Sequence, residues 1–577
     1  MFVKSSWTVY KGKRFQQYHV AESYRDDETG VPRHRLLMNL TPLPPHVIES
    51  IRESLKTGKA LGPPPQISVG DTLRGAGLLA IHRAWQTFGM SEVLDGLTKC
   101  QQDSVEAMVI QRILHPGSKR SLKAQLRDTV FGRFWSAKRM DEDELYEIMD
   151  ILSKQFYSLQ ERLRQRHSQK PAPVLCLYDT TSTYFEGTKA EDGEYGYSRD
   201  KRWDRYQIVI GLVCDEEGIP MAIEIWPGNE SDRTTVVDRI TILRKRFGIE
   251  KAVFIGDRGM YSDINIAALE EAGFDYILGL EWRREREQLE KQAPLQLELF
   301  DKIGVVGWED NNMRYVGCAS EPRRQRAVAL REAGMKRAEE DLAQLARTAA
   351  SRRIYSWTRL REKCNQIVHA AKVADLWQVN ITPLEDMPDP ETKMKLNLQH
   401  AVDAKSLEIR KAIEGKYVLQ TSLAASHYPA EKVDRSYREL QKVERAWRHI
   451  KSFLKIRPVF HHIRRRVRAH VLICFLAYYL VKNMELEMRR FGETREAETV
   501  LRDCDRLRLV ELTLKAGDNT HTDWQWSLGV DGSEIREKLK TMGWWPAIDQ
   551  AARNLVKSTL TDNGKPGSKD GEKKSSA

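Results

Sequence analysis

The sequence predicts an α/β protein whose central part is a mixed β-sheet with helices on its faces. The first observation is a series of short apolar runs with strand-like composition between Pro173 and about residue 280. The second is that Asp-Glu-Glu-Gly joins two of these runs, which indicates an antiparallel hairpin. The third is that a helical segment, SDINIAALEEAG, separates the last two runs. Strands that first form hairpins and then alternate with helices make a mixed sheet.

The N-terminal part divides into two expected regions. Residues 1–65 contain HVAESYRDDETGVPRHRLLMNL, two extended runs around an Asp-Asp-Glu-Thr-Gly turn, which predicts a hairpin. A short helix and the helix-breaking GPPP follow. In residues 66–170, apolar side chains recur every three or four positions, so this region is predicted to be mostly helical. Its basic run SKRSLKAQLR either contacts phosphates or forms a charged surface loop.

The sheet domain is predicted to come from two separate parts of the chain. The first part, 171–280, contains the strands VLCLYDTTSTYF, YQIVIGLVCDEEGIPMAIEIW, KAVFIGD and DYILGL. Residues 281–425 are highly charged, with a helix through EAGMKRAEEDLAQLARTAA and short strands near RYVGCAS and GKYVLQTS, and are interpreted as an inserted domain. Helical sequence in 426–495 completes the domain. An RNase H-like core, of the type also called retroviral integrase-like, has this order of elements.

Two further segments follow the sheet domain. Residues 496–561 form a C-terminal region, and the low-complexity tail 562–577 is expected to be disordered. The most apolar run, Val471 to Val481, is shorter than the roughly 20 residues of a membrane span, so we expect a buried core helix and no membrane partner. The N-terminus has no apolar stretch typical of a signal peptide. Seven cysteines without a CxxC pair indicate neither a zinc site nor disulfides, which fits a reducing cytoplasm.

The charge of the chain favours a polyanionic partner. Its formal charge is +11 and its pI about 9.1, which is typical of nucleic-acid binding and equally compatible with a merely soluble basic protein. The local distribution favours the first interpretation. Between Glu431 and His470 there are 13 Lys or Arg and 4 Asp or Glu, so the positive charge is concentrated there.

Two carboxylates follow apolar strands. Asp179 comes after VLCLY and before three hydroxyl residues, and Asp257 ends KAVFIGD. A buried carboxylate is costly unless a cation compensates it, although either residue alone could simply begin a turn. Because neighbouring strand ends can present both carboxylates to one hard divalent cation, the pair predicts a Mg²⁺ or Mn²⁺ site.

A third carboxylate, Glu444, lies in the helical sequence SYRELQKVERAWRHIKSFLKI. Seven residues make about two helical turns, so Tyr437, Glu444 and Lys451 fall on one line, with Arg448 on the same side. Val443, Trp447, Ile450 and Leu454 form a packing stripe roughly 90° away. By spacing alone, an exposed helix with a Glu444–Arg448 ion pair is the simpler interpretation.

Together these motifs resemble a known family. YDTTSTYFEG, YSRDKRWDRYQIVIGLVCDEEGIPMAIEIWPGNESDRTT, FIGDRGMYS and YRELQKVERAWRHIKSFLKIRPVFHH are similar to DDE-type bacterial insertion-sequence transposases of the insertion-sequence-four superfamily, nearest the insertion sequence sixteen-thirty-four group. The resemblance covers about residues 10–490. The family signature of Tyr, two residues, Arg, three residues, Glu, six residues and Lys matches at Tyr437, Glu444 and Lys451, while Leu440 occupies the Arg position.

The resemblance implies a metal-dependent DNA transposase. In that family, residues matching Asp179, Asp257 and Glu444 hold two divalent ions, which activate the attacking oxygen and stabilise the leaving oxygen. Cleavage at terminal inverted repeats would then be followed by strand transfer into target DNA. Residues expected to contact DNA are Tyr437, Arg448, Lys451, Arg258 and Thr181, and region 66–170 is expected to bind DNA as well.

Some implications of the resemblance stay open. The insertion would hold a DNA hairpin, with Trp282, Trp308, Trp357 or Trp377 stacking on an extruded base, although the sequence identifies none of them. A homodimer that pairs two ends, cytoplasmic and nucleoid-associated when acting, is also a family inference. The alternatives are a structure-selective nuclease without strand joining, a catalytically inactive DNA-binding protein descended from a transposase, and, distantly, a two-carboxylate glycosidase.

Overall fold

The computed structural model describes most of the chain, in two compact units. Unit 1 comprises Met1–Ile151 and Tyr479–Ala577, and unit 2 comprises Leu152–Tyr478. The described residues are 1–10, 13–26, 30–58, 66–134, 141–167, 174–230, 236, 252–291, 304–352, 354–384, 389–516, 519–527 and 529–562. The predicted GPPP breaker, the centre of the Asp-Asp-Glu-Thr-Gly turn and the predicted disordered tail lie outside them, apart from Asp562 at the end of the last helix.

Unit 1 begins with the predicted hairpin. Strands β2 (Lys13–Arg25) and β3 (Pro32–Asn39) pair antiparallel, which confirms the prediction, and β1 (Phe2–Tyr10) adds a third strand. The predicted short helix is α1 (Pro45–Thr57), which begins at a proline and ends at Gly58 in the left-handed conformation. Apolar side chains of β2, β3 and α1 form a small core.

The predicted helical region follows. Its helices in unit 1 are α2 (Ala76–Thr87), α3 (Met90–Val93), α4 (Lys99–Leu114), α5 (Lys119–Arg127), α6 (Val130–Phe134) and most of α7 (Glu142–Lys154). The basic run SKRSLKAQLR is therefore helical, in α5, and not a loop. One strand interrupts the pattern: β4 (Gln66–Arg74) pairs with β15 (Arg508–Ala516), which pairs with β16 (Asn519–Ser527). The first seven residues of β4 are exposed, Ile67 and Val69 among them, and the sequence prediction of a mostly helical region missed this strand.

The remaining elements of unit 1 are helical. They are the C-terminal part of α17 (Arg464–Arg490), α18 (Ala497–Cys504), α19 (Gly529–Thr541) and α20 (Trp545–Asp562). Both α18 and α20 pack against α2.

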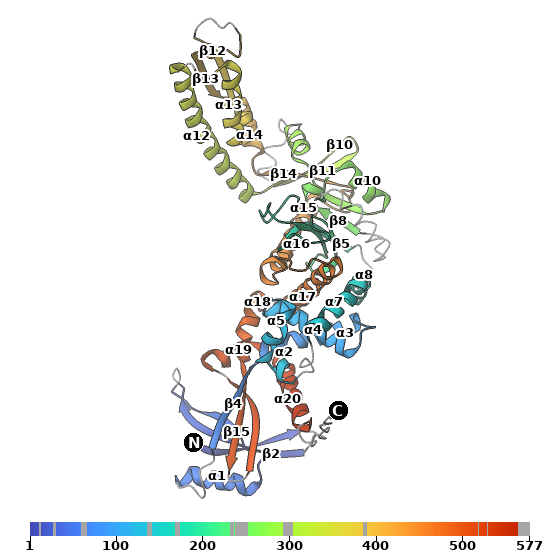
Figure 1. Cartoon of the computed structure of the whole chain (residues 1–577), viewed down its shortest axis with the longest axis vertical. Helices are drawn as coiled ribbons and strands as arrows, with labels where there is room; N and C mark the ends of the chain where they lie inside the picture. Colours follow the sequence, from blue (N-terminus) through green and yellow to red (C-terminus); the bar gives the residue numbers. More distant parts are fainter. Residues whose placement is uncertain are drawn as a thin grey trace, which may run out of the picture. The chain divides into compact units, whose positions relative to one another are not determined.

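Unit 2 contains a mixed eight-stranded sheet in the order β10-β11-β14-β9-β8-β5-β6-β7 (Figure 1). The predicted strands are confirmed as β5 (Val174–Tyr184), β6 (Gln207–Cys214), β7 (Pro220–Pro227), β8 (Ala252–Gly256) and β9 (Asp275–Gly279). The hairpin β6–β7 is antiparallel, and β5, β8 and β9 run parallel. The predicted helix between the last two strands is α10 (Asp263–Glu271), and α8 (Phe156–His167) packs against β7.

Three strands from the predicted insertion extend this sheet beyond β9. They are β10 (Val305–Asp310), β11 (Met313–Ala319) and β14 (Lys416–Thr421), and all their pairings are antiparallel. The helices and strands of the rest of the insertion lie together at one end of unit 2 (Figure 1). They have a core of their own, which includes Leu342, Leu360 and Leu396. This part of the insertion contains α12 (Glu321–Ser351), α13 (Trp357–Ala370), η3 (Ala374–Leu376), β12 (Trp377–Pro383), β13 (Leu396–Val402) and α14 (Ala404–Ile413).

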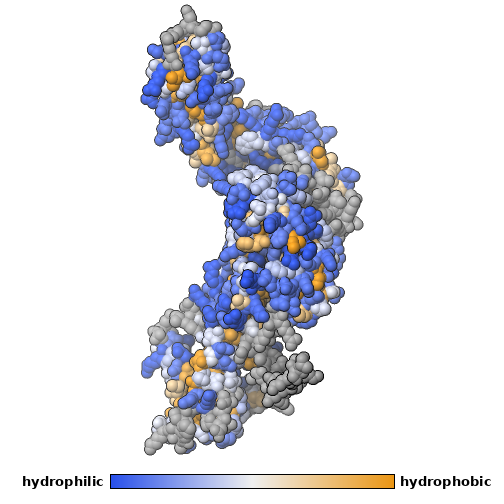
Figure 2. Space-filling view, in the orientation of Figure 1, coloured by the Kyte–Doolittle hydropathy of each residue, from blue (hydrophilic) through white to orange (hydrophobic). Residues whose placement is uncertain are grey.

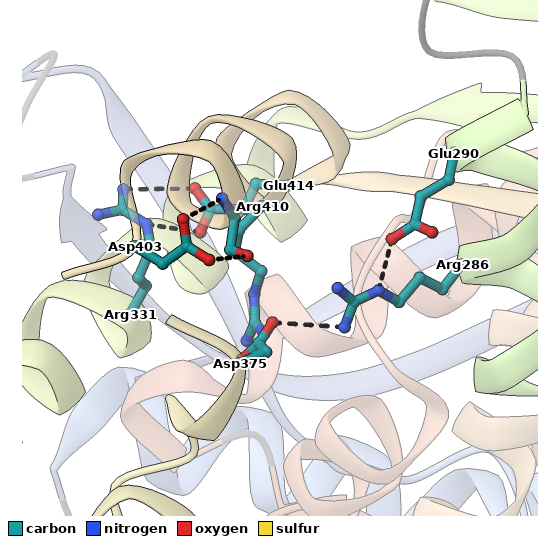
Figure 3. A network of polar contacts seen from close by, with 8 residues as sticks. Arg286, Glu290, Arg331, Asp375, Asp403, Arg410 and Glu414 are labelled. Atoms are coloured by element: carbon teal, nitrogen blue, oxygen red, sulfur yellow. Dashed lines mark hydrogen bonds and ion pairs between the residues drawn. The ribbon is translucent and has the colours of Figure 1, made fainter. Parts of the chain in front are cut away.

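Ion pairs hold the insertion together (Figure 3). Arg286, on a helix over 282–291, contacts Glu290 and Asp375, and Arg410 of α14 also donates to Asp375 at 2.9 Å. Arg331 of α12 donates to Glu414 at 2.8 Å, and their side chains are only 7% and 4% exposed. A buried pair of this kind fixes relative position, because either charge left alone would be costly.

The last part of the predicted sheet domain is helical but interrupted. The predicted single helix is divided into α15 (Ala430–Arg438), α16 (Leu440–Arg448) and a π-helical turn, η4 (His449–Phe453), and a non-helical link precedes α17. Residues 471–481 of α17 are all buried, as predicted. By length and composition α17 could span a membrane, but 94% of its apolar window is buried inside the protein, which identifies it as a core helix.

On the face shown in Figure 2 the surface is mainly hydrophilic, with separate hydrophobic patches. This is the usual character of a folded domain whose apolar groups are mostly packed inside.

We expect Glu414→Ala to destabilise the protein by about 3 kcal/mol, because the Arg331 charge would remain buried without its partner. Thermal and denaturant melts measure the effect. The matched control is Glu321→Ala, which removes an exposed ion pair with Arg324 and should change stability by less than about 0.5 kcal/mol. The double variant Arg331→Met/Glu414→Leu should recover much of the loss; equal losses in the single and double variants would contradict this account.

Candidate active site

Strand pairing brings two of the predicted acids together. The parallel pair β5–β8 aligns Val174 with Ala252 and Leu177 with Ile255, an offset of 78 positions. Asp179 and Asp257 differ by the same 78 positions and lie two residues beyond the last aligned pair. Adjacent strands are about 4.8 Å apart. Asp179 and Asp257 are therefore neighbours at the carboxyl end of this parallel pair.

The environment of Asp179 is unfavourable for a negative charge. Burial, together with the neighbouring Asp257 carboxylate, raises the pKa of Asp179 to about 8, and Glu444 adds to the shift. The Arg199 guanidinium and the backbone N–H of Thr180, which donates to Asp179 Oδ1 at 2.8 Å, oppose it. Arg199 also donates from Nη2 to Thr180 Oγ1 at 3.0 Å. The site therefore concentrates negative charge that its own cations do not fully offset.

Asp257 directly follows β8 and is the N-cap residue of the short helix η2 (Arg258–Met260). Its Oδ1 accepts a hydrogen bond from the Gly259 N–H at 3.0 Å, which fixes the carboxylate at the helix start. The next side chain, Arg258, pairs with Glu285 at 3.2 Å and lies over the ring of Trp282, with 5.3 Å to the ring centroid. Arg258 thus joins the acid-bearing strand end to the helix over 282–291.

Glu444 lies on α16, which packs against β5. The predicted packing stripe is confirmed, since Val443, Trp447, Ile450 and Leu454 are at most 5% exposed. Glu444 itself is exposed. Its influence on the pKa of Asp179 puts it in electrostatic range of the strand ends. In the described part of the chain, no three His, Cys, Asp or Glu residues are grouped closely enough to hold a metal ion as they stand.

Tyr437 reaches the sheet from α15. A Cβ atom on Gly279 would lie 2.6 Å from the Tyr437 hydroxyl, so the glycine is what allows this approach. Burial and the charge of Asp257 raise the pKa of Tyr437 to about 12, which keeps the hydroxyl protonated as a donor. Its ring lies 5.9 Å from that of Tyr417, and the guanidinium of Arg323 lies 4.3 Å from the Tyr417 ring centroid.

Lys451 does not share the exposure of Glu444. The interruptions around α16 break the regular turn on which the predicted line depends, and Lys451 lies in η4 with its side chain 10% exposed. Its Nζ donates to Asp200 at 2.9 Å, and Arg457 pairs with the same carboxylate. Burial and the Arg199 guanidinium lower the pKa of Lys451 to about 8, and the Asp179 charge opposes that shift.

The other predicted DNA contacts differ in accessibility. Arg448 is exposed on α16, three residues before Lys451. Thr181 is only 4% exposed within β5, so its hydroxyl has little access to a ligand in this structure. Leu440, at the Arg position of the family signature, is a packing residue at 7% exposure.

A cationic cavity of about 470 Å³ lies beside Arg258 and Trp282. Residues of α12 and α14, among others, line it, and only two acids, Glu285 and Glu414, contribute. Its basic residues are Arg258, Arg286, Arg323, Arg331, Arg337, Lys372, Arg410 and Lys416. Arg258, Arg286, Arg331 and Arg410 pair with carboxylates, so the net positive charge of the cavity is smaller than the number of its basic residues. The remaining positive charge is suited to phosphate groups.

Comparison with protein families shows the family of the chain. The family model for the transposase DDE domain matches residues 170–480, more than half of the chain, which include all three candidate acids. The chain belongs to the DDE transposase family. A search of curated proteins found no match. Proteins of this family are transposases that bind DNA and generally use divalent metal ions, so a DNA-cleaving or DNA-joining activity is the general expectation for this transposase.

Sequence reasoning did not single out three residues that contact or electrostatically influence predicted site residues of this transposase, namely Arg199, Asp200 and Arg323. Arg199 and Asp200 lie in the YSRDKR motif, whose order along the chain does not reveal that it folds back on β5. Arg323 comes from α12, far from Tyr437 in sequence. For Arg199 and Asp200, the sequence offered only the glycine and aromatic residues around YGYSRDKRW as an indication of a functional loop.

We expect Asp179→Asn to raise the melting temperature of the metal-free transposase more at pH 8 than at pH 5. The pKa of this carboxyl is about 8 in the folded protein and about 4 in the unfolded chain, so the folded protein loses stability as the pH rises from about 4 towards 8. An amide at this position does not ionise, so the variant avoids this loss. The expected increase at pH 8 is at least about 2 °C. Melts in EDTA measure it, and Glu339→Gln on the exposed side of α12 is the control. An equal increase in melting temperature at both pH values would contradict a raised pKa of Asp179.

Proposed function

We propose that this transposase catalyses metal-dependent cleavage at the terminal inverted repeats of an insertion sequence and strand transfer into target DNA. The observation that carries the proposal is the common offset of 78 positions in the β5–β8 pairing and between Asp179 and Asp257. Glu444, on a helix packed against β5, is the third acid. Such a set of acids at adjacent strand ends is suited to phosphoryl chemistry on DNA.

An RNase H-like catalytic core is the fold that we propose for the sheet. Counted from β5, the strands β7-β6-β5-β8-β9 have the order 3-2-1-4-5, with the first three antiparallel and the others parallel to β5. Three antiparallel strands followed by two strands parallel to β5 support an RNase H-like arrangement. The insertion then enters after β9 and returns through β14.

Asp179, Asp257 and Glu444 would hold two Mg²⁺ or Mn²⁺ ions. Carboxylate oxygens are suitable ligands for these hard cations. Burial and the neighbouring Asp257 charge raise the pKa of Asp179, and bound cations would stabilise its ionised form. When bound, the ions supply Lewis-acid activation of the attacking oxygen and stabilisation of the leaving oxygen. Because Glu444 is exposed on its helix, its side chain is free to turn towards the strand ends when DNA and metal bind.

The protein side chains would orient the DNA for in-line displacement. The nucleophile is first water and then a DNA 3'-hydroxyl, so no covalent protein intermediate is needed. Tyr437 donates from a hydroxyl that stays protonated, and Arg448 offers an exposed guanidinium on the helix of Glu444. Contacts of this kind position the backbone and carry little base specificity.

The cationic cavity is proposed to hold DNA phosphates close to the acids. Trp282 is 62% exposed beside Arg258, whereas Trp308 and Trp357 use their indole N–H groups in hydrogen bonds to Gln288 and Ile381. Trp282 is therefore the best candidate for stacking on an extruded base. We also propose that a homodimer pairs the two element ends, and that the protein acts on DNA in the cytoplasm.

We expect Asp179→Asn, Asp257→Asn and Glu444→Gln each to reduce end cleavage by at least about 10³-fold while leaving DNA affinity within about threefold, because the acids act on the metal and not on DNA binding. The assay is Mg²⁺-dependent cleavage of a labelled duplex that carries the terminal repeat. Glu439→Gln, at the junction of α15 and α16, is the matched control and should remain active. Retained cleavage in an acid variant would remove that residue from the site.

Strand joining separates a transposase from a structure-selective nuclease on the same core. The wild-type protein should convert precleaved ends and target DNA into joined product. Cleavage without joining would support the nuclease, and absence of both, with DNA binding intact, would indicate a catalytically inactive DNA-binding protein.

Arg448→Gln should weaken binding to all DNA sequences about equally and reduce the slope of log K against log salt by about 0.9, since one phosphate contact is lost. Titrations at several salt concentrations measure the slope. Arg445→Gln removes an exposed arginine from the same helix, three residues before Arg448, and is the control. An unchanged slope would exclude Arg448 from the phosphate contacts.

A further inference from the structure

The loop between β5 and β6, residues 185–206, exposes three large aromatic side chains. Tyr195, Tyr197 and Trp203 are 56%, 75% and 58% exposed. Tyr197 and Trp203 contact one another, with ring centroids 5.6 Å apart. Exposed aromatic residues that gather on one loop indicate a binding surface, because single apolar residues on a surface are ordinary but clusters are not.

The loop is held firmly against the sheet. A Cβ atom on Gly196 would lie 2.0 Å from the Gly228 carbonyl oxygen, so the backbone between the two tyrosines packs directly on the end of β7. Glu194 and Gln207 exchange two backbone hydrogen bonds at 3.1 Å. The aromatic side chains therefore project from a fixed backbone, and a ligand that stacks on them would lose little entropy to ordering the loop.

The same loop reaches the candidate acids. The Arg199 N–H donates to Ser182 Oγ at 3.0 Å, and its side chain donates to Thr180, the residue after Asp179. Arg199 is two residues from Tyr197, a chain length of about 7 Å. A DNA strand advances about 3.4 Å per nucleotide, so the aromatic surface lies a few nucleotides from a phosphate at Asp179.

Basic residues lie near the aromatic side chains, and acids of the same loop pair with several of them, as Asp200 does with Arg457 and Asp192 with Arg464. Lys201 is exposed on the loop, and a second segment, 455–466, joins the loop through the Glu186 N–H, which donates to the Val459 carbonyl at 2.9 Å. That segment contains five Lys or Arg and no acid, and its Phe460 is 68% exposed. The exposed rings match the bases of a single DNA strand, which stack on aromatic side chains, and the exposed Lys201 is placed to contact its phosphates.

We propose that Tyr195, Tyr197 and Trp203 form a stacking site for the unpaired bases of a DNA strand next to the scissile phosphate. This inference rests on the proposed function, because the position of the site is defined by Asp179. The site is separate from the cationic cavity and from Trp282, which lie on the other side of β8 in the strand order. It holds strand segments that are unpaired during cleavage or target joining.

The test compares a short single-stranded oligonucleotide with a duplex of the same length, by fluorescence anisotropy with the full chain in EDTA. Trp203→Ala and Tyr197→Ala should each weaken single-strand binding about 10-fold and change duplex binding by less than about twofold. Trp203→Phe should retain most of the affinity, because it keeps a ring. Trp7→Ala is the matched control, since Trp7 is 63% exposed in the N-terminal sheet.

Equal loss of single-strand and duplex binding, an equal effect of Trp7→Ala, or unchanged binding in both loop variants would each overturn the proposal. Because no metal is present, the result does not depend on catalysis. A different result would contradict the proposed function: a wild-type protein that neither cleaves nor joins DNA in Mg²⁺.

Discussion

The parallel pairing of β5 with β8 is the constraint on which the rest of the site depends. A sheet register is fixed by every backbone hydrogen bond along the strands, and a slip of one residue would turn each side chain to the other face. The register therefore positions Asp179 against Asp257 far more rigidly than any side-chain contact could. Burial and the neighbouring Asp257 charge both make an ionised Asp179 costly, as its raised pKa indicates, and the stability of the buried strands around the pair offsets that cost.

Around this rigid pair, the other groups come from elements with more freedom. Glu444 projects from a helix whose packing stripe is firmly buried, while the residue itself is exposed. The helix changes to a π-helical turn just after Arg448, and turns of this type often accompany functional positions. The arrangement combines a fixed edge of the sheet with a helix face that is able to adjust to a bound strand.

The elements of the sheet were predictable because their signals are local. Apolar runs, the Asp-Glu-Glu-Gly turn and the α10 segment lie within a few residues of the features they define, and the packing stripe of α16 follows from helical period alone. Features that depend on distant partners were not predictable. The exposed strand β4 pairs with β15, which is more than 400 residues away in the sequence. The strands β10, β11 and β14 join the core sheet, although the chain between β11 and β14 forms a separate module. The fold of 185–206 back onto Thr180 and Ser182 likewise leaves no trace in the local pattern.

The buried carboxylate of Asp200 affects how strongly the protein binds DNA of arbitrary sequence. By holding Lys451 and Arg457 at once, it occupies them with an internal anion of the same charge sign as a phosphate group. A backbone phosphate gains these two cations only by displacing Asp200, so random duplex gains less from this part of the surface than the number of basic residues suggests. Selectivity for a well-fitting substrate is thus set partly by an intramolecular competitor.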